Sequence, residues 1–551
     1  MINADEPLRS RYPIVIAGGG SVGLCLAAEL GWRGVPCLVV EERDMLNDHP
    51  RANAVANRTM EYFRRWGIDE AVTNAGIPPS SPAEYLWVST LDGSEIHRLS
   101  LPPYDELVAT QKTGDYASEE HSWSPYLKTI TGQNEVEAAV LDYVSRLQEV
   151  DYRFSWRLLE FEDDGNGLTC MVEQVATGRR EQVDASFLVG CDGGRSLVRR
   201  QLGVTLEGRA DLASFVSIYF RAPGMIDAHG LGHGNIFFPL HRDHRGFILT
   251  WDDDKTYTYH LVLDEGQNWA SVDPVEAVRA VVGAAIDVEV HSVQPWTAHA
   301  LVASEYRKGR VFLAGDAAHL FSPTGGFGMN TGISDAVDLA WKLKADLEGW
   351  AGPRMLNSYG DERRPIGVRN TTEAADCFDR LFAVMQNGDE LDEESDAADV
   401  LRANLKADLK DQEKLISSSG TLLGYRYDGS GLVVPDSTPA PPDDPRCYTP
   451  VARPGHRAPH VWLESGEAIY DLLGPDFNLL ILAGTSHDVD PIVAAAAALG
   501  LPLQVTEISE PAVRDVYQAD LVMIRPDLMV AWRGHHPPSD PAALIDTIRG
   551  A

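Results

Sequence analysis

Residues 14–23 read IVIAGGGSVG, an apolar run that ends in a G-x-G-x-x-G pattern. Residues 24–30 after it have the composition of a helix, and a second apolar run over residues 37–40 ends in Glu41. The predicted order is strand, tight turn, helix, strand and acid. This order is typical of a site that holds a dinucleotide pyrophosphate over a helix N-terminus and a ribose hydroxyl on a carboxylate.

Each glycine of the pattern has its own role. Gly18 permits the sharp turn out of the strand, and Gly20 lets the backbone approach the phosphates without a Cβ atom in the way. Gly23 lets the helix pack closely on the strand. The pattern alone does not separate FAD from NAD. Glu41 stands where an arginine would accommodate a 2′-phosphate, so a tightly held NADP is disfavoured.

Length and charge set broad limits on the protein. The chain has 551 residues, enough for roughly two to four domains. Hydrophobic residues make up 44% and charged residues 23%, as in ordinary soluble globular proteins. The net charge of −35, from 47 basic and 82 acidic residues, argues against nonspecific binding to nucleic acid or to an anionic membrane.

Targeting and metal-binding signals are not found in the sequence. No stretch approaches the ~18 consecutive apolar residues of a membrane span. Residues 1–7 are polar and acidic, unlike a signal peptide. The six cysteines are scattered without metal-ligand spacing. We therefore expect a cytoplasmic protein with no metal site.

Strand and helix signals alternate from the start, which predicts a doubly wound α/β domain. Residues 86–100 and 152–188 contain alternating runs, such as Tyr152–Trp156, that predict antiparallel strands inserted into this domain. Residues 212–300 are strand-rich and predict a mixed sheet, a natural second domain for substrate. The pattern turns helical over residues 333–420.

The C-terminal part of the chain differs in composition. Residues 434–458 are rich in proline, which predicts an extended linker. Residues 459–551 repeat an α/β rhythm and predict a separate small domain.

Two further glycine-rich motifs follow the first. Residues 188–199 contain Asp192 and Gly193, and residues 311–330 contain an apolar strand that ends in Asp316. A carboxylate at that position can accept a hydrogen bond from a sugar hydroxyl. The glycines after it lead into a helix expected to begin near Thr331, whose N–H groups could face an electron-rich ring.

Together the three motifs resemble those of the FAD-dependent aromatic hydroxylases of the para-hydroxybenzoate hydroxylase type, the group A flavoprotein monooxygenases. The resemblance covers about residues 12–375. The tail, with R-P-D at residues 525–527 and A-W-R at residues 531–533, resembles the thioredoxin-like C-terminal domain of phenol and polyketide hydroxylases, although it lacks the redox cysteine pair.

This resemblance implies an α/β fold with a Rossmann-like FAD-binding domain, an inserted mixed-sheet substrate domain and a C-terminal thioredoxin-like domain. The expected boundaries are FAD-binding domain 1–211 and 300–375, substrate domain 212–299 with parts of 86–125, helical segment 376–433, linker 434–458 and C-terminal domain 459–551.

The same resemblance implies roles for individual residues. Glu41 would hold the adenosine ribose, Asp316 the ribityl chain, and the turn before the last helix would line the isoalloxazine. The expected cofactor-binding residues are Gly18, Gly20, Ser21, Val22, Gly23, Glu41, Arg51, Gln133, Asp192, Gly193, Asp316, Pro323, Gly325, Gly326, Gly328, Met329 and Asn330. Asp192 and Gly193 belong to a motif thought to serve both FAD and NAD(P)H.

Substrate contacts are harder to predict. The candidates are Asn53, Phe238, Trp251 and Pro323, but aromatic side chains also fill cores, so a core position is the alternative for Phe238 and Trp251. The sequence does not identify the catalytic base. His319 lies inside a cofactor motif, which favours a structural or flavin-side role for it.

The chemistry implied by the resemblance has two halves. NADH or NADPH reduces FAD, and the reduced flavin captures dioxygen as a C4a-hydroperoxide that hydroxylates a phenolic or polycyclic aromatic substrate. No second dinucleotide fingerprint is present, so the nicotinamide is expected to bind transiently. The alternatives are a flavin oxidase or dehydrogenase without oxygen transfer, and a noncatalytic FAD-binding protein. A homodimer is one expected assembly.

Overall fold

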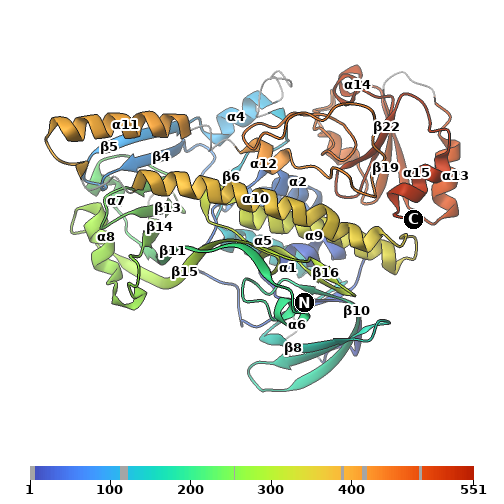
Figure 1. The fold of residues 1–551 in the computed structure, drawn as a ribbon, viewed down its shortest axis with the longest axis horizontal. Coiled ribbons are helices and arrows are strands. Elements are labelled where there is room, and N and C mark those ends of the chain that lie inside the picture. The colour runs from blue at the N-terminus through green and yellow to red at the C-terminus, as the bar shows by residue number, and fades with distance from the viewer. Residues whose placement is uncertain (1–6, 112–121, 253–254, 386–389, 413–417, 483–486) are drawn as a thin grey trace.

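The computed structural model describes residues 7–111, 122–252, 255–385, 390–412, 418–482 and 487–551 (Figure 1). Two eight-stranded sheets and a four-stranded sheet organise the chain. No helix of the described ranges is both long enough and apolar enough to cross a membrane.

The first sheet forms the nucleotide-binding domain. Its order is β16-β17-β10-β1-β2-β7, with β8 and β9 forming an antiparallel extension beside β10. Neighbouring strands along the path β17–β10–β1–β2–β7 are parallel, so each connection between them crosses over the sheet. The strands are β1 (Arg11–Ala17), β2 (Cys37–Glu41), β7 (Val150–Phe154), β8 (Trp156–Asp163), β9 (Leu168–Gln174), β10 (Arg180–Gly190), β16 (Arg307–Lys308) and β17 (Val311–Leu313).

One sequence expectation about this sheet is wrong. The run Tyr152–Trp156 was expected in an antiparallel insertion, but residues 150–154 form β7, which pairs in parallel with β2. The alternation of apolar and polar residues in β7 predicted a strand but did not distinguish parallel from antiparallel pairing. Strands β8, β9 and β10 are antiparallel as expected.

Helices cover the first sheet and carry the glycine motifs. Helix α1 (Ser21–Trp32) follows the first turn and packs against both α5 (Gln133–Val144) and α9 (Phe327–Leu347). Helix α9 begins at Phe327, four residues before the expected Thr331, because a 3-10 turn at Thr324–Gly326 leads directly into it. The remaining elements of this region are β3 (Ala54–Val55), α2 (Asn57–Trp66), α3 (Asp69–Asn74), α4 (Tyr104–Gln111), β6 (Thr129–Ile130) and α6 (Leu197–Leu202).

The second sheet is mixed, as expected, in the order β18-β15-β11-β14-β13-β12-β4-β5. Only β12 and β4 pair in parallel among its described strands. The expected domain boundaries at residues 211/212 and 299/300 fall inside β11 and β15, which continue toward the first sheet. The strands are β4 (Ala83–Val88), β5 (Glu95–Leu101), β11 (Leu206–Arg221), β12 (Ile236–Pro239), β13 (Gly246–Thr250), β14 (Thr256–Val262), β15 (Glu289–Ala303) and β18 (His319–Leu320).

The two faces of the second sheet have different covers. Helices α7 (Met225–His229) and α8 (Pro274–Val282) pack on one face through a hydrophobic core of aliphatic and aromatic side chains. The other face meets α10 (Met355–Met385) through Phe378, and α11 (Asp396–Gln412) through Leu405 and Leu409. Figure 1 shows α11 above β4 and β5, and α10 running from there toward the C-terminal domain.

The C-terminal domain has the element order β-α-β-α-β-β-α. Its sheet order is β20-β19-β21-β22, with β19 and β20 parallel and the other pairs antiparallel. This arrangement is compatible with the thioredoxin-like expectation. The elements are β19 (Phe477–Leu482), α13 (Asp490–Ala498), β20 (Leu503–Ile508), α14 (Pro511–Tyr517), β21 (Leu521–Ile524), β22 (Val530–Gly534) and α15 (Pro541–Ile548).

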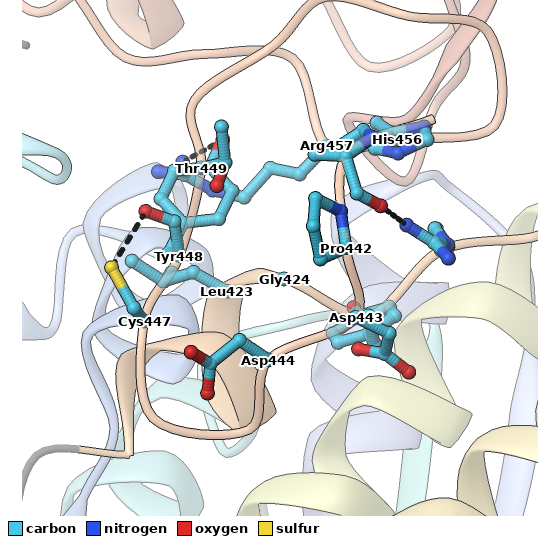
Figure 2. A pocket seen from close by; sticks show the side chains of 13 residues that line it. Leu423, Gly424, Pro442, Asp443, Asp444, Cys447, Tyr448, Thr449, His456 and Arg457 are labelled. Carbon is cyan, nitrogen blue, oxygen red and sulfur yellow. Dashed lines mark hydrogen bonds between the residues drawn. The ribbon is translucent and has the colours of Figure 1, made fainter. Parts of the chain in front are cut away.

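The proline-rich segment 434–458 lies on the surface of the C-terminal domain. It contains no helix or strand, and Val434 N and Gly455 N donate to the carbonyl oxygens of Ala531 and Val530. The hollow in Figure 2 lies between this segment and the short helix α12 (Ser419–Leu423). None of the expected site residues lines it.

Candidate cofactor and substrate site

The glycine turn has the geometry of a phosphate cradle. Gly18 has φ +100°, and a Cβ atom there would overlap the carbonyl oxygen of Cys191. A Cβ atom at Gly23 would overlap the carbonyl oxygen of Gly18. At Gly20, by contrast, a Cβ atom would meet no described atom closer than 3.8 Å, so it would fill open space in front of the helix. That open space is what an approaching pyrophosphate requires.

An acid that sequence reasoning missed lies at the start of α1. Glu137 Oε1 accepts hydrogen bonds from Ser21 N at 3.0 Å, Ser21 Oγ at 2.7 Å and Gln133 Nε2 at 2.8 Å. A carboxylate at a helix N-terminus complements the helix dipole. The signal was available in the sequence, because Gln133 and Glu137 are four residues apart and lie on one face of α5.

Glu41 is fixed beside the glycine turn. Its Oε2 accepts from Gly19 N at 2.7 Å, and its Oε1 accepts from Arg43 N at 3.0 Å and Arg43 Nε at 2.8 Å. Each carboxylate oxygen has two acceptor sites. Oε1 uses both and Oε2 uses one, so a ribose hydroxyl could still donate to Oε2. Arg43 was not expected at the site from the sequence, and its Nη2 lies 4.0 Å from the Cβ position of Gly20.

The second motif contacts the first. A Cβ atom at Gly18 would lie 2.9 Å from Asp192 Cα, so the two turns are packed together. Asp192 Oδ2 accepts from the backbone N–H groups of Leu197 and Val198 at 2.7 and 3.1 Å and caps α6. Its Oδ1 is buried without a hydrogen-bond partner among the described residues. Gly193 beside it has φ +76°, which favours glycine.

The third motif packs against the first turn of α1, next to the first motif. A Cβ atom at Gly315 would lie 2.7 Å from Val22 Cγ2, so this turn lies against the first turn of α1. Asp316 is exposed to solvent. Desolvation by the surrounding chain raises the pKa of its carboxyl group, whereas His319 and Arg51 lower that pKa by a smaller amount.

The start of α9 is tied to β3 by Asn330. Asn330 Oδ1 accepts from Ala56 N and Thr59 Oγ1, and its Nδ2 donates to the carbonyl oxygens of Ala54 and Gly326. These bonds use both donor hydrogens and both acceptor sites of the amide. The Asn330 side chain therefore positions the helix N-terminus, and a cofactor can reach this residue only through its backbone.

The rest of this turn is shaped by glycine. Gly325 and Gly326 have φ of +81° and +68°, and a Cβ atom at Gly326 would lie 3.0 Å from Ala54 Cβ. Gly328 and Met329 are half-buried, and Pro323 is exposed. The turn can thus present backbone N–H groups and Pro323 to a ligand.

A loop over residues 49–53 joins the cofactor turns to the second sheet. Gln133 N donates to Ala52 O at 2.8 Å, which places this loop at the start of α5. Arg51 is exposed, and Asn53 Nδ2 is buried with no hydrogen-bond partner in the described ranges. His49 contacts Ser217 of β11 and Ser292 of β15, with 2.7 Å from each ring nitrogen to a hydroxyl.

His319 belongs to an internal network. It is fully buried, and its Nε2 lies 2.6 Å from Asp335 Oδ2. Asp335 also accepts a hydrogen bond of 2.8 Å from Arg363 Nε. Although burial favours the protonated acid, His319 and Arg363 keep the pKa of Asp335 below its ordinary value. This geometry favours the structural role of His319 over a role as catalytic base.

Two aromatic candidates for substrate contact lie on the second sheet. Phe238 stacks on Trp87 with ring centroids 5.0 Å apart. Trp251 Nε1 donates to Thr258 Oγ1 at 2.7 Å, and its ring lies 3.2 Å from the Cβ position of Gly132, beside α5. Phe238 and Trp251 are only partly buried, so each leaves some ring surface for a ligand.

Comparison with known proteins gives matches over nearly the whole chain. Residues 11–374 match the family model "FAD binding domain", and residues 451–550 match "Aromatic-ring hydroxylase, C-terminal". A 4-methyl-5-nitrocatechol 5-monooxygenase of Burkholderia sp is 32% identical, with 99% of this chain and 98% of that protein covered. Aklavinone 12-hydroxylase RdmE of Streptomyces purpurascens is 30% identical, with 97% of each covered.

Solved structures agree with these matches. The rebeccamycin biosynthetic enzyme RebC with reduced flavin is 33% identical with a TM-score of 0.87, and the comparison covers 99% of this chain and 100% of that one. A complex of aklavinone-11 hydroxylase with FAD and aklavinone is 28% identical with a TM-score of 0.82 and the same coverage.

Proposed function

Because the chain belongs to the family of FAD-dependent aromatic-ring hydroxylases, and is a flavoprotein monooxygenase, we propose that it hydroxylates a phenolic or polycyclic aromatic substrate with NADH or NADPH and dioxygen. The observation that carries this proposal is the convergence of three glycine motifs beside a sheet face with aromatic side chains. The 4-methyl-5-nitrocatechol monooxygenase and the two aklavinone hydroxylases named above support this substrate class.

In this proposal the first and third motifs hold the two ends of FAD. The open cradle at Gly20 and the N-terminus of α1 bind the pyrophosphate, and Glu41 binds the adenosine ribose. Asp316 binds the ribityl chain, and the N-terminus of α9 faces the pyrimidine end of the ring. Bound FAD, once reduced, supplies the oxygen-transfer chemistry, and the protein orients it against the substrate.

A histidine and aromatic rings next to the cofactor turns are uncharged. Burial, with a smaller effect of Arg51, lowers the pKa of His49 to about 4, so this histidine is neutral at physiological pH. Aromatic rings such as Phe238 and Trp251 supply apolar surface for a flat substrate. A closed apolar site limits water access, which protects a reactive oxygen donor from wasteful decay.

The deciding experiment is turnover under ¹⁸O-labelled dioxygen with a panel of phenols, catechols and polycyclic aromatic compounds. Substrate-stimulated oxidation of NADH or NADPH and one ¹⁸O atom in the product are expected. NAD(P)H consumption with an unlabelled, oxidised product would instead favour a flavin oxidase or dehydrogenase on the same scaffold. Bound flavin that NAD(P)H cannot bleach would point to a noncatalytic FAD-binding protein.

The nicotinamide and the assembly are also part of the proposal. NADH or NADPH binds transiently, since only one dinucleotide fingerprint is found in the sequence. Stopped-flow reduction with each nucleotide would identify the preferred one. A homodimer is the proposed assembly, and light scattering on the purified holoprotein tests it.

A further inference from the structure

His260 lies in the middle of the sheet face that carries Phe238. The strand register places His260 of β14 directly opposite Ser217 of β11 on one side and Phe247 of β13 on the other. Directly opposed residues of antiparallel strands share one face of a sheet. The His260 and Phe247 rings stack with centroids 4.4 Å apart, so the imidazole is held in a fixed orientation.

One hydrogen bond determines the tautomer of His260. Trp296 Nε1 donates to His260 Nδ1 at 3.2 Å. An indole N–H can only donate, so Nδ1 must carry the lone pair. In a neutral imidazole the proton then sits on Nε2. Burial, with a smaller effect of His49, lowers the pKa of His260 to about 3, so the ring is neutral at physiological pH.

The Nε2–H group of His260 is therefore a buried donor without an acceptor. The side chain is 4% exposed, and Nε2 has no hydrogen-bond partner in the described part of the chain. Buried donors in native proteins are nearly always paired, and an unpaired one is costly. A donor left open in this way marks a position that a ligand oxygen can complete.

The location of His260 connects this donor to the cofactor turns. His49 Nε2 lies 2.7 Å from the hydroxyl of Ser217, the residue opposite His260. His49 opens the loop whose Ala52 carbonyl accepts from Gln133 N at the start of α5. The unpaired donor thus lies on the part of the sheet face nearest to that loop.

We propose that His260 donates a hydrogen bond from Nε2 to a carbonyl or phenolic oxygen of the aromatic substrate and so selects oxygen-bearing rings. This inference rests on the proposed function. The rings of Phe247 and Trp296 pack on the imidazole and make its surroundings apolar, which suits an aromatic ligand. The donor itself is uncharged, and burying a carboxylate against an uncharged donor is far more costly than burying a carbonyl.

The test compares ligand pairs that differ by one oxygen, 1-naphthol with naphthalene and 9-fluorenone with fluorene. Equilibrium binding to the oxidised holoenzyme is followed by the change in flavin absorbance and by tryptophan quenching. The wild-type protein should prefer the oxygenated member of each pair. His260→Phe should weaken binding of that member by about three- to tenfold and leave the other unchanged.

His229 gives a matched control on the opposite face of the sheet. Its Nδ1 accepts from Leu231 N at 3.1 Å, its Nε2 is likewise buried and unpartnered within the described residues, and its ring packs on Phe237. His229→Phe should leave the preference for the oxygenated ligands intact. Each substitution removes one unpaired donor but also takes the acceptor away from Trp296 Nε1 or from Leu231 N, so the two variants should change the melting temperature by similar amounts.

Three results would overturn the inference. They are a wild-type protein with no preference for oxygenated ligands, a His260→Phe protein that keeps the preference, and an equal loss in His229→Phe. If His260→Phe fails to fold, Trp296→Phe is tested in its place. Without the indole N–H group, His260 Nδ1 is free to take the proton from Nε2, and the preference for the oxygenated ligands should fall. Binding needs no turnover, so a failed oxygen-transfer assay would refute the proposed function without deciding this result.

Discussion

The guanidinium of Arg525 donates two hydrogen bonds, 2.6 and 2.8 Å long, to the carboxylate of Glu362 in α10. Arg525 lies in the C-terminal domain between β21 and β22, and neither side chain is more than 1% exposed. Asp338 of α9, Asp527 and Lys342 complete the cluster. The C-terminal domain is thus joined to the helices of the cofactor site by buried charge.

Removing the arginine should destabilise the protein strongly. Arg525→Met leaves the carboxylate of Glu362 buried with one cation fewer, and breaking such a cluster costs about 3–5 kcal/mol of unfolding free energy. Urea unfolding followed by circular dichroism measures the loss. The control is Arg146→Met, since Arg146 and Asp142 form an exposed pair whose loss should change the free energy by less than about 1 kcal/mol. Equal effects from the two variants would contradict the structural role of Arg525.

The same cluster predicts a pH dependence of stability. Burial, with repulsion from Glu362 and Asp527, raises the pKa of Asp338 to about 8. The folded state then holds this proton more tightly than the unfolded chain does. The stabilising contribution is complete below pH 4 and is lost as pH rises toward 8.

Asp338→Asn should remove this dependence, because asparagine cannot release a proton. Wild-type unfolding free energy should fall between pH 6 and pH 8 by up to ~1.4 kcal/mol per pH unit relative to the variant. Urea titrations at both pH values check the difference. Parallel curves for the two proteins would show that Asp338 is ionised throughout this range.

The open cradle predicts that Gly20→Val abolishes FAD retention without loss of folding. Gly20 has φ −75° and ψ −171°, which any residue adopts, and a Cβ atom there meets no described protein atom closer than 3.8 Å. The valine would instead occupy the phosphate position. The flavin-to-protein absorbance ratio measures retention, and the melting temperature of the apoprotein reports folding.

Gly431→Val is the matched control for this substitution. Gly431 is an exposed glycine whose φ lies outside the left-handed region, and its Cβ position lies 3.6 Å from the nearest atom. This variant should purify with the wild-type flavin content. A yellow, active Gly20→Val protein would refute the assignment of the cradle.

Buried neutral histidines predict acid sensitivity. Burial lowers the pKa of His260 to about 3 and of His49, His229 and His456 to about 4. The unfolded chain binds these protons near pH 6.5, so stability is complete above that pH and is lost as pH falls toward 4. Each histidine contributes a slope of up to ~1.4 kcal/mol per pH unit.

His229→Phe should reduce this slope by about one proton. Unfolding free energies at pH 7.5 and pH 5.0 for the wild type and the variant give the proton count directly. An unchanged slope would mean that His229 is protonated in the folded protein.

Local sequence patterns predicted the nucleotide-binding core well. The turn at residues 18–23, its flanking strands and Glu41 lie within one continuous segment, so periodicity and spacing specify them. The mixed character of the second sheet was also predicted. The start of α9 was misplaced because the two left-handed glycines, Gly325 and Gly326, pass directly into helix without a separate loop.

Contacts between distant segments could not be predicted in this way. Arg525 and Glu362 are 163 residues apart, and no composition or period in either segment refers to the other. The parallel pairing of β4 with β12 is long-range in the same sense. The donor at His260 is visible only once Trp296 is seen beside it, because its tautomer depends on a residue two strands away.

Helix α10 has a consequence for how such a chain can evolve. Its 31 residues extend about 45 Å, and Glu362, which contacts the C-terminal domain, lies about 24 Å along the helix from Phe378, which packs on the second sheet. A recombination event that replaced residues 451–551 with a foreign sequence would keep this helix but change the residue facing Glu362. C-terminal domains should therefore be exchangeable only between proteins that both carry the arginine of the C-terminal domain and its acidic partners on the helices. The C-terminal domain and helix α10 are then inherited as one unit.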